Sequence, residues 1–334
     1  MKRSGSWQLM MSETLKKVKE SLPICEPPFW AFDGHLQSIL GHLLPSKTLQ
    51  ENGEVFHIPV MHGPDKIHSK YFKGEKPIVV YLFHGLGGSS DASYMHRTAI
   101  VARDLGLHVF MTNHRGCGEG AGLATGPYHS GRSEDLSVVI SYGREMLPHC
   151  KHIAIGFSLS ANALLLLISK HKDFVLPDAA IAVNAPINLD QTSQNLNIGL
   201  NQIYNQTFLR ELKTYIKANR AKDLLLVKKA KTMRQFDEFL TAPICGFENH
   251  LDYYEKCSAK KYLNLIEIPT VILTAKDDPF VNVNDYLEST LSPSTVLHIE
   301  EKGGHMGYLS KIGRRTYRWL DVVLKEYLRA IISP

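Results

Sequence analysis

The sequence predicts an α/β fold in which a mostly parallel central sheet is flanked by helices and interrupted by a helical insertion. Three observations predict this fold class. Short, continuous apolar runs such as 78–83 are typical of strands that are buried on both faces. These runs alternate with helix-forming segments, as the strands of a parallel sheet require. The alternation stops after residue 183 and resumes near residue 269, and the stretch between contains no convincing strand.

The expected elements follow in chain order. Residues 1–50 are helical and amphipathic in patches. Alternating runs at 55–60 and 67–72 flank a Gly-Pro turn signal and predict a hairpin. Parallel strands are then expected at 78–83, 107–112, 152–155, 179–183, 269–274 and 295–299. Helices are expected near 92–105, 132–147, 159–170 and 311–331, with a short helix between the last two strands.

These elements divide the chain into an N-terminal helical segment at 1–50, a core built from 51–187 and 259–334, and a helical cap at 188–258. Within the cap, five apolar residues recur at the spacing of one helix face: Phe208, Leu209, Leu212, Tyr215 and Ile216. Residues 210–234 also carry nine Lys or Arg and two acids, a net charge of +7. Two interpretations stay open: a solvated helix face, and peripheral contact of the basic cap with an anionic membrane or substrate.

Composition excludes several classes of protein. The apolar fraction of 44% and the charged fraction of 21% are those of a soluble globular protein. The net charge of +5, without a basic tract interleaved with aromatics, argues against nucleic acid as a partner. Five scattered cysteines without a C-x-x-C predict reduced thiols. With neither a signal peptide nor a membrane span in the sequence, a cytoplasmic protein is expected, and the sequence makes no prediction of its oligomeric state.

The most informative segment is Gly156-Phe157-Ser158-Leu159-Ser160, which joins an apolar strand to a helix-forming run. A serine at a sharp strand-to-helix turn is the nucleophile elbow of the α/β-hydrolases. Gly156 permits the tight turn, and the following helix N-terminus stabilises developing negative charge. Ser160 replaces the second glycine of the usual Gly-x-Ser-x-Gly pattern. The alternative interpretation of the motif is a turn serine that caps a helix.

Candidates for a base and an orienting acid follow in the order Ser, Asp, His that this fold uses. Asp277 and Asp278 lie just after one expected strand, and His305 lies in a glycine-rich loop after the next. Loops at the carboxyl ends of parallel strands converge where such folds bind ligands. We therefore expect Ser158 as nucleophile, His305 as base and Asp278 as orienting acid, with Asp277 as the less favoured acid.

The oxyanion hole is expected from the backbone N–H groups of Leu159 and Leu86. Leu86 lies in a glycine-rich loop after the strand at 78–83, where a backbone must approach a substrate carbonyl. Neither the dinucleotide-binding pattern nor the P-loop pattern occurs there. We expect no cofactor and no metal.

Several sequence blocks together resemble the signatures of the YheT-like α/β-hydrolases: His84-Gly85-Leu86-Gly87-Gly88-Ser89, Asn113-His114-Arg115-Gly116-Cys117, Tyr128-His129-Ser130-Gly131, Gly156-Phe157-Ser158-Leu159, Ala275-Lys276-Asp277-Asp278-Pro279-Phe280 and Gly303-Gly304-His305-Met306-Gly307. His35-Leu36-Gln37-Ser38 and Cys257-Ser258-Ala259 resemble the family's N-terminal segment and the end of its cap. The resemblance implies an esterase or lipase for short- to medium-chain acyl esters, with triad roles for Ser158, Asp278 and His305.

Some relatives in this family are credited with an acyltransferase motif, His-x4-Asp, and the match around His129 is loose because Glu134 stands at the fifth position. Helix capping by Ser130 or Ser133 is the favoured role of this segment.

The sequence thus predicts a serine carboxylic ester hydrolase whose partner is an acyl ester or a lipid. Two alternatives stay open. An alcohol or lysolipid in place of water would make the protein an acyltransferase. A non-catalytic binding protein of the same fold is the other, with Ser160 as the sign of a relaxed site.

Overall fold

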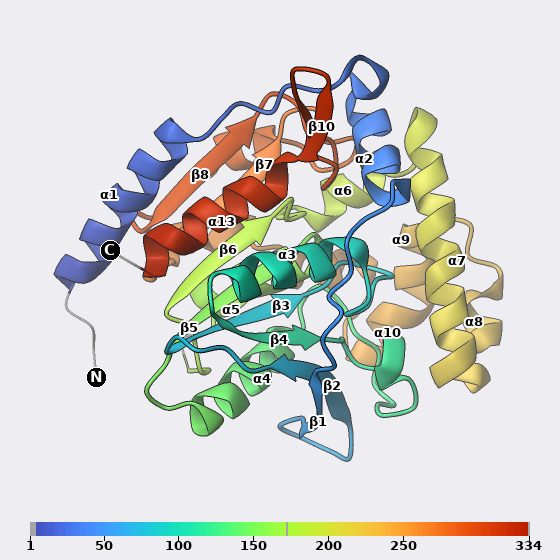
Figure 1. The fold of residues 1–334 in the computed structure, drawn as a ribbon. Coiled ribbons are helices and arrows are strands. Elements are labelled where there is room, and N and C mark those ends of the chain that lie inside the picture. The colour runs from blue at the N-terminus through green and yellow to red at the C-terminus, as the bar shows by residue number, and fades with distance from the viewer. Residues whose placement is uncertain (1–4, 172, 333–334) are drawn as a thin grey trace.

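An eight-stranded sheet forms the centre of the computed structural model, which describes residues 5–171 and 173–332 (Figure 1). In spatial order its strands are β1 Glu54–Pro59, β2 Lys66–Phe72, β4 His108–Thr112, β3 Ile78–Phe83, β5 Lys151–Phe157, β6 Ala179–Val183, β7 Thr270–Ala275 and β8 Thr295–Glu300. β1 and β2 form an antiparallel hairpin, and β2 is also antiparallel to β4. All other pairs in this sheet are parallel, as the alternation of elements predicts.

The sheet is buried on both faces because its central strands are apolar throughout. Every residue of β3, β6 and β7 is buried. Alternate side chains of β3 enter two separate cores, one containing Val79, Tyr81 and Phe83 and the other Ile78, Val80 and Leu82. Two apolar faces require helices on both sides of the sheet.

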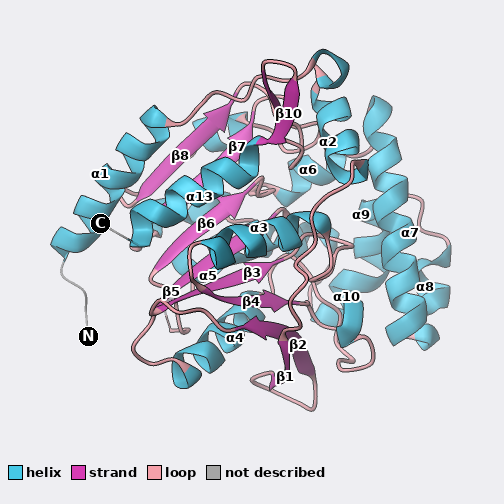
Figure 2. Cartoon of the chain, viewed as in Figure 1, coloured by secondary structure: helices cyan, strands magenta, loops and turns pink. Residues whose placement is uncertain are grey.

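Helices cover both faces of the sheet (Figure 2). On one side, α1 Gly5–Ser21, α3 Ser93–Asp104 and α13 Trp319–Ile332 pack on the sheet and α13 contacts the other two. On the other side, α4 Ser133–Met146 packs beside α5 Leu159–Ser169, which lies on β5 and β6. All eleven residues of α5 are buried, so the helix that follows Ser158 is held firmly in the core.

The remaining helices lie in the connections between these elements. Near the N-terminus are η1 Phe29–Ala31 and α2 Gly34–Leu43, and η2 Gly118–Gly120 follows β4. Between β6 and β7 the described residues form helices only: α6 Leu189–Asn195, η3 Gly199–Asn201, α7 Gln202–Asn219, η4 Ala221–Asp223, α8 Leu224–Lys228, α9 Met233–Phe236, η5 Asp237–Thr241, α10 Ala242–Cys245, α11 His250–Cys257 and η6 Lys260–Leu265. In Figure 1, α7, α8 and α10 lie beyond the arrowheads of β3 and β4. A short helix, α12 Asn284–Leu287, connects β7 to β8.

The expected helix at 311–331 is wrong at its start. The chain there forms an antiparallel hairpin of β9 Leu309–Ile312 and β10 Arg315–Arg318, and α13 begins only at Trp319. Gly313 takes φ +58° in the turn between the two strands, a conformation that glycine adopts without strain and that a helix cannot contain.

In the ranges that the structure describes, no helix is long and apolar enough to cross a membrane. All five cysteines are free thiols, as the sequence predicts: Cys25, Cys117 and Cys257 are buried, and Cys150 and Cys245 are partly buried.

Candidate active site

Ser158 occupies the sharp turn between β5 and α5. Its backbone has φ 52° and ψ −116°, a strained conformation for a residue with a side chain. A Cβ atom on Gly156 would lie 2.7 Å from the carbonyl oxygen of Ser160 and 2.9 Å from the Cα of Ala161. Strand and helix can approach this closely only because position 156 has no side chain. The turn has the geometry of a nucleophile elbow.

The structure brings Ser158, His305 and Asp278 into one hydrogen-bonded chain. His305 Nε2 lies 2.9 Å from Ser158 Oγ, and His305 Nδ1 lies 2.8 Å from Asp278 Oδ2. Since a carboxylate only accepts, Nδ1 carries the proton and Nε2 is free to accept from the serine hydroxyl. The side chain of Asp278 is fully buried, whereas that of His305 is 10% exposed.

Asp278 rather than Asp277 contacts His305. Three donors besides His305 reach the Asp278 carboxylate: Asn184 Nδ2 at 2.8 Å and the backbone N–H groups of Phe280 and Val281 at 3.2 and 3.0 Å. These donors hold the carboxylate in place beside His305. Asp277 Oδ1 instead accepts from the backbone N–H of Gly304 at 2.9 Å.

Asn184 is a site residue that the sequence interpretation missed. It donates to Asp278 and to the carbonyl oxygen of Gly304, and its own Oδ1 accepts from Tyr308 Oη. In the described ranges, the non-glycine residues with positive φ are Ser158, Asn184, Met306 and Tyr308, and all four belong to this site. Such clustering of backbone strain is typical of functional sites. The position of Asn184, directly after a buried strand, was the available signal.

Helix α2 holds the loop that carries His305. Ser38 Oγ accepts from the backbone N–H of His305 at 2.8 Å, and Gln37 exchanges hydrogen bonds with the backbone of Leu309. A Cβ on Gly304 would lie 2.3 Å from the carbonyl oxygen of Gly34. The His35–Ser38 block of the sequence therefore contributes two residues that fix the histidine loop.

Leu86 and Leu159 line the same pocket as Ser158. In the hydrogen bonding of the described residues, neither backbone N–H has an acceptor, so both remain available to a ligand. A Cβ on Gly85 would lie 3.1 Å from the Cβ of Ser158, which shows how closely this loop approaches the serine. Both features are those of an oxyanion hole.

Ser160 fits the elbow because its hydroxyl has partners. Ser160 Oγ donates to the carbonyl oxygen of His84 and contacts His114 Nε2. His84 in turn accepts from the backbone N–H of His114 through Nε2, so its Nδ1 carries a proton and bonds the carbonyl oxygen of Gly85 at 2.7 Å. Burial lowers the pKa of His84 to about 4, which keeps this ring neutral. The serine thus ties α5 to the loop that carries Leu86.

The capping role expected for Ser130 or Ser133 is wrong. Arg132 is the N-cap residue of α4, and no side chain caps this helix. Ser133 Oγ donates to the carbonyl oxygen of Ala163, and Ser130 Oγ accepts from Asn162 Nδ2, because both hydroxyls face α5 rather than the helix end.

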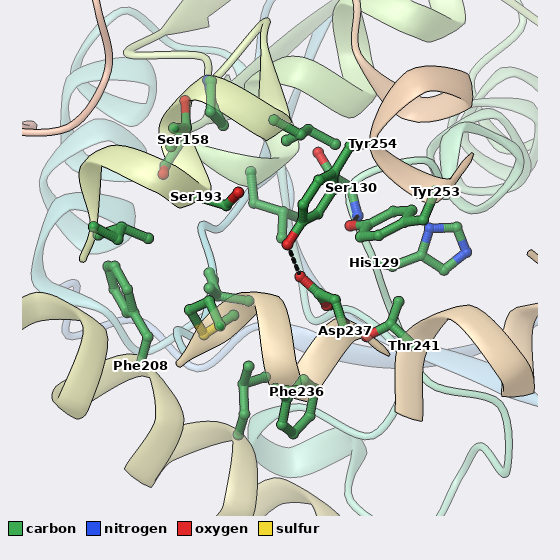
Figure 3. A pocket seen from close by; sticks show the side chains of 18 of the residues that line it. His129, Ser130, Ser158, Ser193, Phe208, Phe236, Asp237, Thr241, Tyr253 and Tyr254 are labelled. Carbon is green, nitrogen blue, oxygen red and sulfur yellow. Dashed lines mark hydrogen bonds between the residues drawn. The ribbon is translucent and has the colours of Figure 1, made fainter. Parts of the chain in front are cut away.

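A pocket opens beside Ser158 (Figure 3). Apolar side chains from the core and from residues 188–258 form much of its wall: Leu86, Leu159, Pro186, Leu189, Leu196, Phe208, Leu212, Met233, Phe236 and Phe280. This lining is typical of pockets for small apolar ligands.

Glu211 of α7 lies against the loop that carries Leu86. A Cβ on Gly87 would lie 1.9 Å from Glu211 Oε2. Burial raises the pKa of Glu211 from 4.5 to about 7, although Arg210 partly opposes this. The folded protein therefore holds this proton more tightly than the unfolded chain does. Stability is lost as the pH rises from the unfolded pKa to the folded one.

We expect Glu211→Gln to remove this loss. The variant should match the wild type at pH 4.5 and, because solvent screens a partly exposed group, exceed it by on the order of 1 kcal/mol above pH 7. Urea unfolding at pH 4.5, 6 and 8 measures the difference. A difference that does not change with pH would contradict the assignment.

The class of protein follows from this fold and this site. Residues 78–312, more than half of the chain, match the alpha/beta hydrolase fold family. The chain therefore belongs to the α/β-hydrolases.

Comparison with individual proteins narrows this class. The chain is 32% identical over 270 residues to the putative esterase YheT of Escherichia coli K12, a match that covers 77% of this chain and 78% of the relative. It is thus a YheT-like α/β-hydrolase of the esterase and lipase type. The phospholipase ABHD3 of Mus musculus is 27% identical, with 92% of this chain and 78% of the relative covered. The monoacylglycerol lipase of Saccharomyces cerevisiae is 29% identical, with 78% and 63% covered.

Solved structures share the fold. The esterase Pf2001 of Pyrococcus furiosus superposes with a TM-score of 0.56 over 85% of this chain and 98% of that one, at 16% identity.

Proposed function

We propose that this protein is a serine carboxylic ester hydrolase that acts on short- to medium-chain acyl esters. The observation that carries the proposal is the hydrogen-bonded chain from Asp278 through His305 to Ser158, which ends at an apolar pocket. The names of the relatives, an esterase, a phospholipase and a monoacylglycerol lipase, support the same class of reaction.

The proposed reaction has two steps. Ser158 Oγ attacks the acyl carbonyl carbon while His305 Nε2 accepts its proton, and Asp278 stabilises the imidazolium that forms. The N–H groups of Leu86 and Leu159 stabilise the oxyanion. When the intermediate collapses, the alcohol leaves with the proton from His305. Water, activated by the same histidine, then releases the acid and restores Ser158.

The test is hydrolysis of p-nitrophenyl esters over a series of acyl lengths, before and after treatment with a fluorophosphonate. We expect a rate that peaks at one chain length and disappears as Ser158 becomes labelled, with the adduct identified by mass spectrometry. Labelling of another residue, or none, would contradict the proposal. Added alcohol that is converted to a new ester would instead favour an acyltransferase.

We also propose that residues 188–258 act as a cap that shapes the acyl pocket. Side chains from α6, α7, α9 and α11 line that pocket, among them Leu189, Phe208, Met233 and Tyr254. On this view the cap, and not the sheet, determines which acyl chains fit.

A peripheral contact of this cap with anionic membranes is a further part of the proposal. In α8, Leu225 is 78% and Leu226 50% exposed, beside the exposed Lys228. Apolar side chains among basic ones are typical of helices that lie on anionic lipid.

We expect the protein to co-sediment with phosphatidylserine-containing vesicles and not with phosphatidylcholine alone. Replacing Leu225 and Leu226 by Ser should weaken this binding about tenfold, whereas Ile312→Ser, on the β9 hairpin, should not. Equal binding by both variants would exclude α8 as the contact.

A further inference from the structure

The mainly apolar pocket contains a carboxylate. Asp237 lines the pocket and is only 8% exposed. Figure 3 shows it on the side of the pocket opposite Ser158, joined to Tyr254 by a hydrogen bond. Asp237 Oδ2 accepts from Tyr254 Oη at 2.7 Å, and Oδ1 accepts from Thr241 Oγ1 at 2.7 Å.

This carboxylate has capacity for a further donor. An ionised carboxylate offers about four acceptor positions, and Thr241 and Tyr254 use two of them. In the part of the chain that the structure describes, Asp237 forms no ion pair, the arrangement that normally offsets the cost of burying a charge. Burial raises the pKa of Asp237 to about 6. Packing alone does not require a carboxylate here, since a neutral side chain would fill the space at lower cost.

Two other features of the pocket wall support a polar ligand. Asp237 begins η5, a π-helical turn. Such turns are rare in proteins, and those that occur often lie at functional sites. Thr192 of α6 lines the same pocket and is 8% exposed, and its buried Oγ1 has no hydrogen-bond partner in the described structure. A buried hydroxyl without a partner in a pocket wall indicates a polar ligand group.

We propose that Asp237 and Thr192 form a subsite that binds a hydroxyl group on the pocket-bound chain of the ester, with Asp237 as its acceptor. The inference rests on the proposed function, in which this chain is attached to the carbonyl attacked by Ser158. A hydroxyl fits better than an ammonium group because a cation must lose far more hydration in an apolar pocket. The preferred substrates are therefore esters of hydroxylated chains rather than plain alkyl esters.

The test compares p-nitrophenyl hexanoate, octanoate and decanoate with the same esters carrying a terminal hydroxyl. We expect the wild type to prefer the hydroxylated ester at one length, in kcat/KM. Asp237→Asn should lower this preference, the ratio of kcat/KM for the hydroxylated ester to that for the plain ester, about tenfold or more, and Thr192→Val about threefold. Asp252→Asn, which removes a carboxylate of α11 that pairs with Lys256 outside the pocket, is the matched control and should leave the preference unchanged.

Wild-type protein without any preference, or variants that keep it, would overturn the subsite. Measuring how tightly esters bind to Ser158→Ala protein distinguishes failure of the subsite from failure of the proposed hydrolysis, because binding needs no reaction. At one of the six-, eight- and ten-carbon lengths, the methyl ester with a terminal hydroxyl should bind this variant about tenfold more tightly than the plain methyl ester, and Asp237→Asn should abolish the difference. Equal binding of the hydroxylated and plain esters at all three lengths would exclude the subsite whatever the reaction is.

Discussion

Asp278→Asn is expected to lower kcat for ester hydrolysis about 10³- to 10⁴-fold while KM changes little. The carboxylate accepts the Nδ1 proton of His305 at 2.8 Å, which leaves Nε2 free to accept from Ser158. The amide of asparagine can donate to Nδ1 and thereby favour the tautomer with a proton on Nε2. In that tautomer, His305 cannot take the proton of the serine hydroxyl.

The neighbouring carboxylate is the control for this experiment. Asp277 accepts from the backbone N–H of Gly304 and does not contact the imidazole. Asp277→Asn keeps an acceptor for this bond and should cost about threefold in kcat through small movements of the loop. Steady-state kinetics on one p-nitrophenyl ester compares the two variants. A larger loss of kcat in Asp277→Asn than in Asp278→Asn would mean that Asp277, and not Asp278, orients His305.

Gly156→Ala is expected to destabilise the fold by about 3 kcal/mol and to reduce kcat about 100-fold. The new methyl group would lie 2.7 Å from the carbonyl oxygen of Ser160 and 2.9 Å from the backbone of Ala161. These are backbone atoms of a fully buried helix, so they cannot move as a flexible side chain would. Relief of the contact requires α5 to shift from β5, which displaces Ser158 and the N–H of Leu159.

Urea unfolding and ester kinetics measure the two effects together. Ser160→Gly is the comparison because it removes a side chain at the same turn but leaves the backbone atoms that face residue 156 in place. It should cost only about 1 kcal/mol, since the His84 carbonyl oxygen that loses the serine also lies 3.2 Å from His114 Nε2. Wild-type stability and activity in Gly156→Ala would mean that the elbow is not as tightly packed as described.

Much of the fold could be predicted because its signals are local. The apolar runs of β3 and β7 and the helical period of α7 are visible within a few residues of sequence. The C-terminal hairpin could not be predicted in this way. Lys311 of β9 donates its backbone N–H to the carbonyl oxygen of Glu26, almost the whole chain away. Such a partner leaves no trace in the local pattern of apolar residues.

The candidate site likewise contains residues that local sequence signals predict and residues that depend on distant contacts. Ser158 follows β5 directly, and Asp278 and His305 lie in the loops after β7 and β8, so strand ends and residue types together select them. Ser38 and Asn184 act across 267 and 94 residues of chain to hold His305 and Asp278. Their contacts depend on how α2 and β6 pack, which the local sequence does not specify.

The structure changes the interpretation of Ser160. As a departure from the usual glycine, it suggests a relaxed site. In the structure its hydroxyl connects His84 and His114 behind Gly85, so the departure adds contacts to the elbow and its loop.

Hydrolysis of the preferred p-nitrophenyl ester by wild-type and Ser158→Ala protein tests the central claim most directly. The account predicts that the variant keeps its fold and its affinity for the substrate but loses kcat by about 10³-fold or more, because no other described group takes the place of Oγ. Equal rates for the two proteins would contradict it, since the hydrogen-bonded chain of Ser158, His305 and Asp278 would then have no part in the reaction.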